Sequence, residues 1–219
     1  MRKMYLSAPL PFVGQKRMLA KEFMKVLEQY PDGTLFVDLF GGSGLLSHIT
    51  KSLKPHSTVI YNDFDNYRFR MKHIPQTNQL LADIREMVGN SVPRHKIIKG
   101  ELRERIFSRI EQEENSTGYV DFITLSSSIL FSMKYKLSVQ DMRKEALYNN
   151  IRKTGYPECT DYLEGLEIVS CDYKEVFNRY KDIPGVVFLV DPPYLSTDVG
   201  TYNMYWNMAD YLDVLNVLK

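Results

Sequence analysis

The apolar residues near both ends of this chain fall into short continuous runs. Residues 35–40, 57–62 and 186–190 are rich in β-branched and aromatic residues, as are strands that are buried on both faces of a parallel sheet. The first run is followed by apolar residues at helical spacing, at Leu45, Leu46, Ile49 and Leu53. The pattern predicts an α/β fold with a mostly parallel sheet and helices on both faces.

The middle of the chain breaks this alternation, and its pattern predicts a helical insert. Helical spacing recurs at Leu80, Leu81, Ile84 and Val88 and again at Ile98, Leu102, Ile106 and Ile110. The polar residues 111–118 are expected to form a loop. We therefore expect residues 1–66 and 161–219 to form one domain and residues 67–160 an inserted subdomain. A last helix is expected over residues 209–218.

Glycines follow the first predicted strand, as Gly41-Gly42-Ser43-Gly44. Glycines at a strand-to-helix turn let the backbone approach a ligand closely. The strand at 57–62 ends at Asp63, about 20 residues further on, where nucleotide-binding α/β folds place an acid on a ribose hydroxyl. The pattern predicts a nucleoside site, but Ser47 occupies the last glycine position of the dinucleotide fingerprint, which argues against a pyrophosphate pocket.

The tetrapeptide Asp191-Pro192-Pro193-Tyr194 follows the run at 186–190. Two prolines stiffen the end of the predicted strand, and open α/β sheets bind their ligands at the carboxyl ends of their strands. Alternatively, the four residues form an ordinary Asp-Pro turn.

The chemistry that this tetrapeptide favours is substitution at an exocyclic amine. The lone pair of such an amine is delocalised into the ring, and acceptors on its N–H groups draw it back. The carboxylate of Asp191 and the carbonyl of Pro192 are two such acceptors, and Pro193 has no N–H to compete for them. Tyr194 would stack on a base flipped out of a duplex. No metal is needed, and His48, His56, His73 and His95 show no ligand spacing.

The composition of the chain says little about its function. The chain has 219 residues, 44% of them hydrophobic, and no segment long enough to cross a bilayer. Cys159 and Cys171 lack zinc spacing, so we expect reduced thiols and a cytoplasmic location. The net charge of +1 is no evidence for nucleic acid. Basic residues nevertheless gather in the middle, where solvated helix faces and phosphate contacts both remain open.

Together with Pro11-Phe12-Val13-Gly14-Gln15-Lys16, these motifs resemble the Dam-like DNA adenine-N6 methyltransferases, over residues 9–66 and 168–206. The resemblance implies a Rossmann-like methyltransferase sheet and S-adenosylmethionine as cofactor. It also implies a set of cofactor-binding residues, namely Phe12, Gly14, Lys16, Asp38, Phe40, Gly42, Gly44, Asp63, Asp172, Tyr173 and Asp191. Asp63 would hold the ribose, and Asp172 with Tyr173 the adenine. This chain has Phe12 and Gln15 where the family usually has Trp and Gly.

The resemblance implies methylation of a flipped adenine in DNA, with catalysis by Asp191, Pro192, Pro193 and Tyr194, target recognition by the insert, and a role in restriction-modification. Residues 126–136 would lie near bases, although Leu125, Ile129 and Phe131 can equally be core. Tyr202, Tyr205 and Trp206 would line the base pocket or pack on the sheet. The family's sheet continues past this point, so we expect a truncated product with weak activity. RNA adenine or cytosine-N4 methylation, a non-catalytic DNA-binding remnant and a nicotinamide dehydrogenase remain alternatives.

Overall fold

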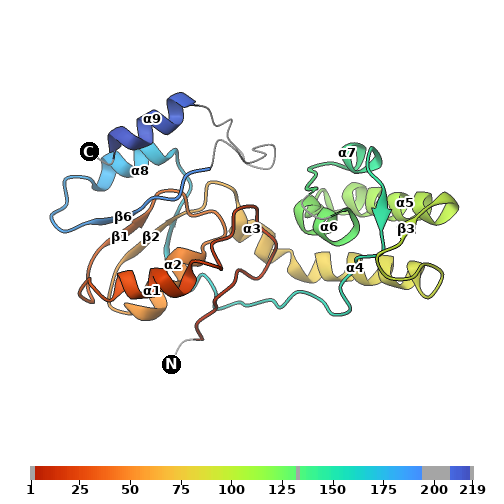
Figure 1. Cartoon of the computed structure of the whole chain (residues 1–219), viewed down its shortest axis with the longest axis horizontal. Coiled ribbons are helices and arrows are strands. Elements are labelled where there is room, and N and C mark those ends of the chain that lie inside the picture. The colour runs from red at the N-terminus through yellow and green to blue at the C-terminus, as the bar shows by residue number, and fades with distance from the viewer. Residues whose placement is uncertain (1–2, 132–133, 194–207, 218–219) are drawn as a thin grey trace. The chain divides into compact units, whose positions relative to one another are not determined.

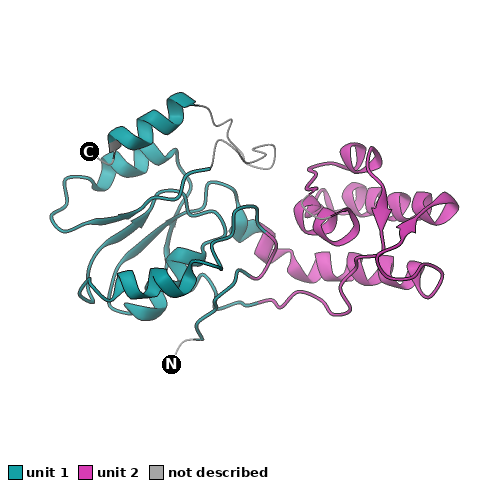
Figure 2. Ribbon diagram, viewed as in Figure 1, with its two compact units in different colours: residues 1–8, 12–69, 159–219 teal, residues 9–11, 70–158 magenta. Residues whose placement is uncertain are grey.

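The computed structural model describes residues 3–131, 134–193 and 208–217. The chain forms two compact units (Figure 2). Unit 1 contains residues 1–8, 12–69 and 159–219, and unit 2 contains residues 9–11 and 70–158.

The described part of unit 1 is built on a four-stranded parallel sheet with the order β5-β2-β1-β6. Its strands are β1 (Phe36–Asp38), β2 (Val59–Asn62), β5 (Glu167–Val169) and β6 (Val187–Leu189). In the centre, Phe36 of β1 pairs with Val59 on one side and with Val187 on the other. The predicted parallel α/β sheet is confirmed. The edge strand β5 was missed, because it is three residues long and begins with an exposed glutamate.

Helices cover both faces of this sheet (Figure 1). On one face, α1 (Ala20–Leu27) and α2 (Leu45–Leu53) pack against Phe36 and Val59. On the other face, α8 (Tyr173–Tyr180) and α9 (Met208–Val217) pack against Val37 and Ile60. Neighbouring residues of a strand point to opposite faces, so a continuous apolar run supplies both cores.

Unit 2 is mainly helical and also contains a short antiparallel ribbon. Helix α3 (Tyr67–Lys72) leads from unit 1 into α4 (Ile74–Val88), and the remaining helices are α5 (Gly100–Thr117), α6 (Phe122–Ile129) and α7 (Val139–Arg143). The ribbon pairs β3 (Ile97–Ile98) with β4 (Leu147–Tyr148). Its two-residue strands are too short for sequence periodicity to reveal. The apolar residues that were expected to line α4 are buried, as are Ile98, Ile106 and Ile110.

The predicted loop at residues 111–118 is wrong, because α5 continues to Thr117 and ends at Gly118. Gly118 adopts a left-handed conformation, with φ of 72°, and donates its N–H to the Glu114 carbonyl. Two acids of the segment are held by arginines of the same unit, Glu111 by Arg143 and Glu113 by Arg109. Glutamate and glutamine favour helices despite their polarity, so a polar stretch alone does not indicate a loop.

A buried ion pair anchors the start of α6 in unit 2. The Arg70 guanidinium donates to the Asp121 carboxylate and to the Pro11 carbonyl, and Asp121 in turn accepts the backbone N–H of Thr124. Within α6, Leu125 is buried in the core. Ile129 is also buried, whereas Phe131 beyond the helix is 59% exposed. No helix in the described ranges is long and apolar enough to cross a membrane.

Candidate active site

A cavity of unit 1 opens at the carboxyl ends of β1, β2 and β6. It encloses about 780 Å³ of space, including open solvent at its mouth. Five chain segments meet there, and the lining residues are Phe12, Val13, Gly14, Gln15, Lys16, Leu39, Phe40, Gly41, Gly42, Ser43, Leu45, Leu46, Asn62, Phe64, Asp65, Tyr173, Asp191, Pro192 and Pro193.

The glycine turn between β1 and α2 forms one wall of the cavity. Neighbouring atoms leave no room for a side chain at Gly41 or Gly42. A Cβ at Gly41 would lie 2.3 Å from the Tyr61 ring and 2.7 Å from the Asn62 carbonyl oxygen. At Gly42, where φ is 50°, a Cβ would lie 3.0 Å from the Phe12 ring. Packing against Tyr61, Asn62 and Phe12 therefore requires glycine at these two positions, which also line the cavity.

Asp191, Pro192 and Pro193 follow β6 directly and form the opposite part of the lining. The Lys16 Nζ lies 2.8 Å from Oδ2 of Asp191. It also donates to the Gly14 carbonyl over 2.9 Å. The amino-terminal motif and the Asp-Pro-Pro motif therefore meet in space. Tyr194, Tyr202, Tyr205 and Trp206 lie outside the described residues.

Aromatic rings form a further part of the lining. The rings of Phe40 and Tyr173 lie 4.8 Å apart at an angle of 33°, and the Phe12 ring packs edge-on against Tyr67. Burial raises the pKa of Tyr173, so its hydroxyl stays neutral at physiological pH. These neutral, apolar faces suit a planar base.

The structure thus brings most of the predicted site residues together around one cavity. Those that line it are Phe12, Gly14, Lys16, Phe40, Gly42, Tyr173, Asp191, Pro192 and Pro193. Four others, Asp38, Gly44, Asp63 and Asp172, are absent from the lining and shape the surrounding backbone. Gly44 is the residue before α2, with φ of 71°.

Asp63 and Asp172 each hold the start of a helix. The carboxylate of Asp63 accepts the backbone N–H groups of Tyr67 and Arg68 and the hydroxyl of Tyr61. Burial raises the pKa of Asp63, while these hydrogen bonds lower it. The Asp172 side chain accepts the Lys174 N–H over 2.8 Å at the start of α8. Helix capping is therefore the role in which both carboxylates are observed.

Asp38 is buried beneath the glycine turn. Its carboxyl accepts the Ser47 hydroxyl over 2.7 Å. Its pKa is raised to about 7, mainly by burial and also by the negative charge of Asp191, while hydrogen bonds from Ser47 and the Phe40 backbone act in the opposite direction. The glycine turn therefore rests on a carboxyl that titrates near neutral pH.

Two residues that line the cavity, Asn62 at the end of β2 and Asp65 just after it, were not predicted as site residues. Asp65 lines the cavity, two positions beyond the aspartate that the spacing indicated. Asn62 is buried and joins three strand ends. Its amide donates to the carbonyls of Leu39 and Cys171 and accepts the Cys171 N–H. A buried side-chain amide can satisfy several backbone groups at once, but no local pattern reveals which ones it meets.

No group of three His, Cys, Asp or Glu residues that could hold a metal ion occurs among the residues that the structure describes.

Comparison with known proteins identifies a family and a relative of this chain. A family model described as the D12 class of N6 adenine-specific DNA methyltransferases matches residues 12–214. A protein of Haemophilus influenzae named "Putative methyltransferase" is 38% identical to this chain over 224 residues. The match covers 100% of this chain and 75% of the length of that protein.

Proposed function

Because the chain belongs to the D12 class of N6 adenine-specific DNA methyltransferases, we propose that its cavity binds S-adenosylmethionine and an adenine flipped out of DNA, and that it methylates specific sites. The observation that carries this proposal is the single cavity lined by both the glycine turn and Asp191-Pro192-Pro193. A donor and an acceptor held side by side gain from proximity, which supplies about 7–11 kcal/mol in well-oriented reactions.

The residues of the cavity fit this cofactor. Gly41 and Gly42 line the cavity without side chains of their own. Asp65 lines the same cavity, and its carboxylate can accept hydrogen bonds from ribose hydroxyls. Phe40 and Tyr173 offer faces for a purine. When bound, S-adenosylmethionine supplies the methyl group from its positively charged sulfur, and the remainder of the cofactor leaves as a neutral thioether.

Asp191 and Pro192 activate the adenine amine. The carboxylate of Asp191 and the carbonyl of Pro192 accept the two N6 hydrogens, which returns the lone pair to nitrogen for attack on the methyl carbon. As the C–N bond forms, N6 becomes positive and then releases a proton through the hydrogen bond to Asp191. The prolines keep these acceptors on a stiff backbone that has no N–H of its own to compete.

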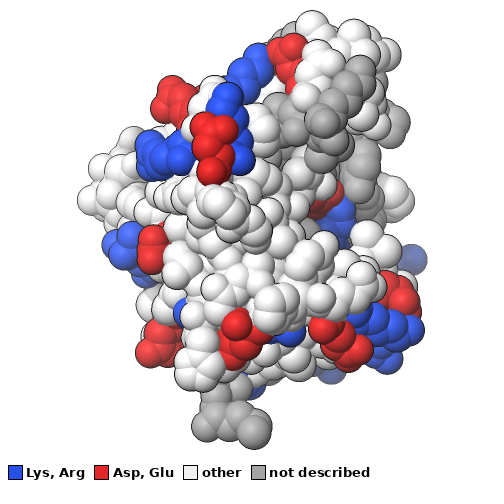
Figure 3. All heavy atoms as spheres, turned by 90° about the vertical axis from the view of Figure 1, so that its left-hand side faces the viewer, with Lys and Arg blue, Asp and Glu red and all other residues white. Residues whose placement is uncertain are grey.

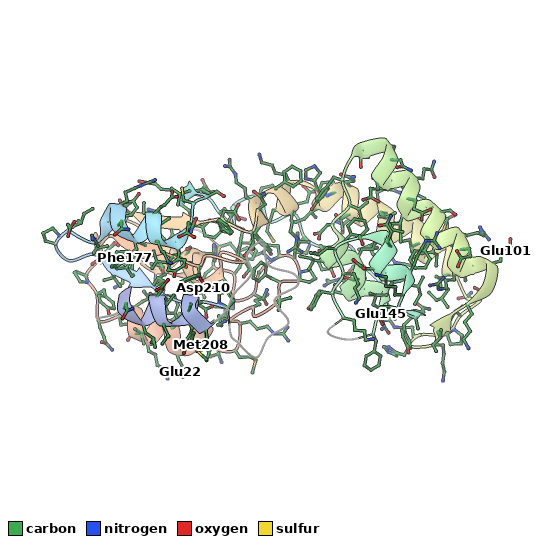
Figure 4. All side chains as sticks on the ribbon, turned by 90° about the horizontal axis from the view of Figure 1, so that it is seen from above. Glu22, Glu101, Glu145, Phe177, Met208 and Asp210 are labelled. Atoms are coloured by element: carbon green, nitrogen blue, oxygen red, sulfur yellow. The ribbon has the colours of Figure 1, made fainter. Side chains whose placement is uncertain are left out.

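Unit 2 is our candidate for the DNA-contacting region, and its ion pairs indicate which cations are available. Many of its basic residues are held by carboxylates, including Arg70, Arg109, Arg143, Lys134, Lys136 and Lys144. Figure 4 labels Glu145, the partner of Lys134 and Lys136. These cations are poor phosphate ligands, since phosphate binding would require breaking their ion pairs.

A second group of cations surrounds the β3–β4 ribbon, and we call it the ribbon surface. Its members are Arg94, Lys96, Lys99, Arg152 and Lys153, which are all exposed. Arg94 donates to the Ile151 carbonyl, and Asn149 donates its backbone N–H to the Lys96 carbonyl, so the two strands bring these cations together. In the described part of the chain, none of the five forms a salt bridge with a carboxylate. Unpaired cations on one surface favour contact with phosphates.

The decisive experiment is methyl transfer from tritiated S-adenosylmethionine to DNA, followed by analysis of the methylated nucleosides. We expect N6-methyladenine, and loss of transfer in Asp191→Ala with cofactor binding retained in part. Product on cytosine N4, or label in RNA only, would contradict the proposal. So would full activity of the Asp191→Ala variant.

A further inference from the structure

We propose that Lys16 is a positioning residue for Asp191, which it holds in the orientation that receives the adenine amine. This inference rests on the proposed function, and it assigns to Lys16 a role other than the cofactor contact implied by family resemblance. Its basis is the 2.8 Å ion pair between Lys16 Nζ and Asp191 Oδ2.

The ammonium group of Lys16 is fixed from its own segment. Gly14 has φ of 74°, and its carbonyl accepts a hydrogen bond from Lys16 Nζ over 2.9 Å. The Lys16 carbonyl in turn accepts the Leu19 N–H at the turn before α1. The side chain is 16% exposed. Lys16 therefore differs from a surface lysine, whose ion pairs are weakened by solvent and by side-chain freedom.

The ion pair places a charged donor directly on the carboxylate of Asp191. The two residues that follow it are prolines, which have no backbone N–H. A charge-assisted hydrogen bond from Lys16 is about twice as strong as a neutral one. A carboxylate can accept about four hydrogen bonds, so the ion pair is compatible with a further bond from the adenine N6.

The two possible roles of Lys16 make different kinetic predictions. If the lysine contacted the cofactor, its removal would raise the Kd for S-adenosylmethionine and leave transfer at saturation almost unchanged. If it positions Asp191, its removal leaves the Kd unchanged and lowers the rate of transfer, because the acceptor of the amine hydrogen is displaced. A displacement of about 1 Å in such a group can lower a rate about 100-fold.

The test compares Lys16→Met with Lys16→Arg, and uses Lys21→Met as the matched control, since Lys21 is exposed on α1. The Kd for S-adenosylmethionine is measured by titration calorimetry, and the transfer rate by single turnover on DNA at saturating cofactor. We expect Lys16→Met to keep its Kd within about twofold and to lose about 10- to 100-fold in rate. Lys16→Arg, which keeps the charge, should recover most of that loss, and the control should match the wild type.

Three results would overturn the inference. One is a Kd for Lys16→Met that rises tenfold or more while the saturated rate is kept, about the loss expected when a 1.4 kcal/mol contact is removed. Another is a wild-type rate in Lys16→Met. The third is a double-mutant cycle in which Lys16→Met slows the Asp191→Asn variant as much as it slows the wild type. If Lys16 acts through the Asp191 carboxylate, its replacement should have little further effect once that carboxylate has been removed. A wild-type protein that fails to bind S-adenosylmethionine would instead contradict the proposed function itself.

Discussion

Asp38 lies at the end of β1 with a side chain that is 1% exposed. Its pKa of about 7 exceeds the ordinary value of 3.8 mainly because burial disfavours the charged form. The native protein therefore binds this proton more tightly than the unfolded chain does. It follows that stability contributed by the protonated form is lost as the pH rises from about 4 towards 7.

Asp38→Asn should remove this pH dependence, because the amide stays neutral and its oxygen can still accept the Ser47 hydroxyl. We expect the variant to gain stability relative to the wild type as the pH rises from about 4.5 to 7.5, by an amount on the order of 4 kcal/mol at most. Urea unfolding at several pH values measures the difference. The exposed Asp182 provides the control, as Asp182→Asn. A stability difference that stays constant over this range would show that Asp38 does not titrate as inferred.

At the scale of elements, α8 connects a capping residue to the cavity. Asp172 caps its first turn through the Lys174 N–H, and Tyr173, the first residue of the helix, lines the cavity. Val176 packs one turn further on against the sheet. Figure 4 labels Phe177 in the same helix. The start of α8 is therefore expected to affect both the stability of the unit and the shape of its cavity.

Replacing the cap tests whether Asp172 acts through the helix or on the cofactor. Asp172→Ala should lower stability by about 1 kcal/mol, and Asp172→Ser should restore most of it, since serine is a good N-cap. Thermal unfolding and titration with S-adenosylmethionine are measured on both variants. If Asp172 acts through the helix, cofactor affinity recovers with stability in Asp172→Ser. Restored stability without restored affinity would favour the direct contact with adenine that family resemblance implies.

At the scale of the whole molecule, the net charge is only +1, but the charged side chains are unevenly distributed. On the face of unit 1 shown in Figure 3, acidic and basic side chains lie interspersed. In unit 2, by contrast, the ribbon surface gathers cations that have no acidic partner among the described residues. Local charge is therefore a better guide to a polyanionic partner than the sum over the chain.

The ribbon surface can be tested by the salt dependence of DNA binding. Replacing Arg94 and Lys96 together by Gln should weaken binding and lower the slope of log affinity against log salt by about 1 to 2, because each phosphate contact contributes about 0.9. Lys25→Gln with Lys144→Gln removes the same charge from lysines already paired with acids. We expect this control to leave the slope almost unchanged. Equal losses in both double variants would refute a specific role for the ribbon.

Much of unit 1 could be predicted from local sequence, since buried strands, a glycine turn and a pair of prolines are each encoded by adjacent residues. Unit 2 was less predictable. Its ribbon has strands of two residues, and α5 extends through a polar stretch in which Arg143 of α7 holds Glu111. Such contacts join residues that are distant in the chain.

The sequence by itself determined the alternation of strand and helix, the glycine turn after β1 and the stiff Asp-Pro-Pro segment after β6. Backbone preference and hydrophobic period depend only on neighbours, so these features can be recognised without coordinates. Only the tertiary structure decided that Lys16 meets Asp191, that Asp65 lines the cavity while Asp63 caps a helix, and which cations have acidic partners. Hydrogen bonds and ion pairs depend on distances in space, which folding sets and spacing along the chain does not.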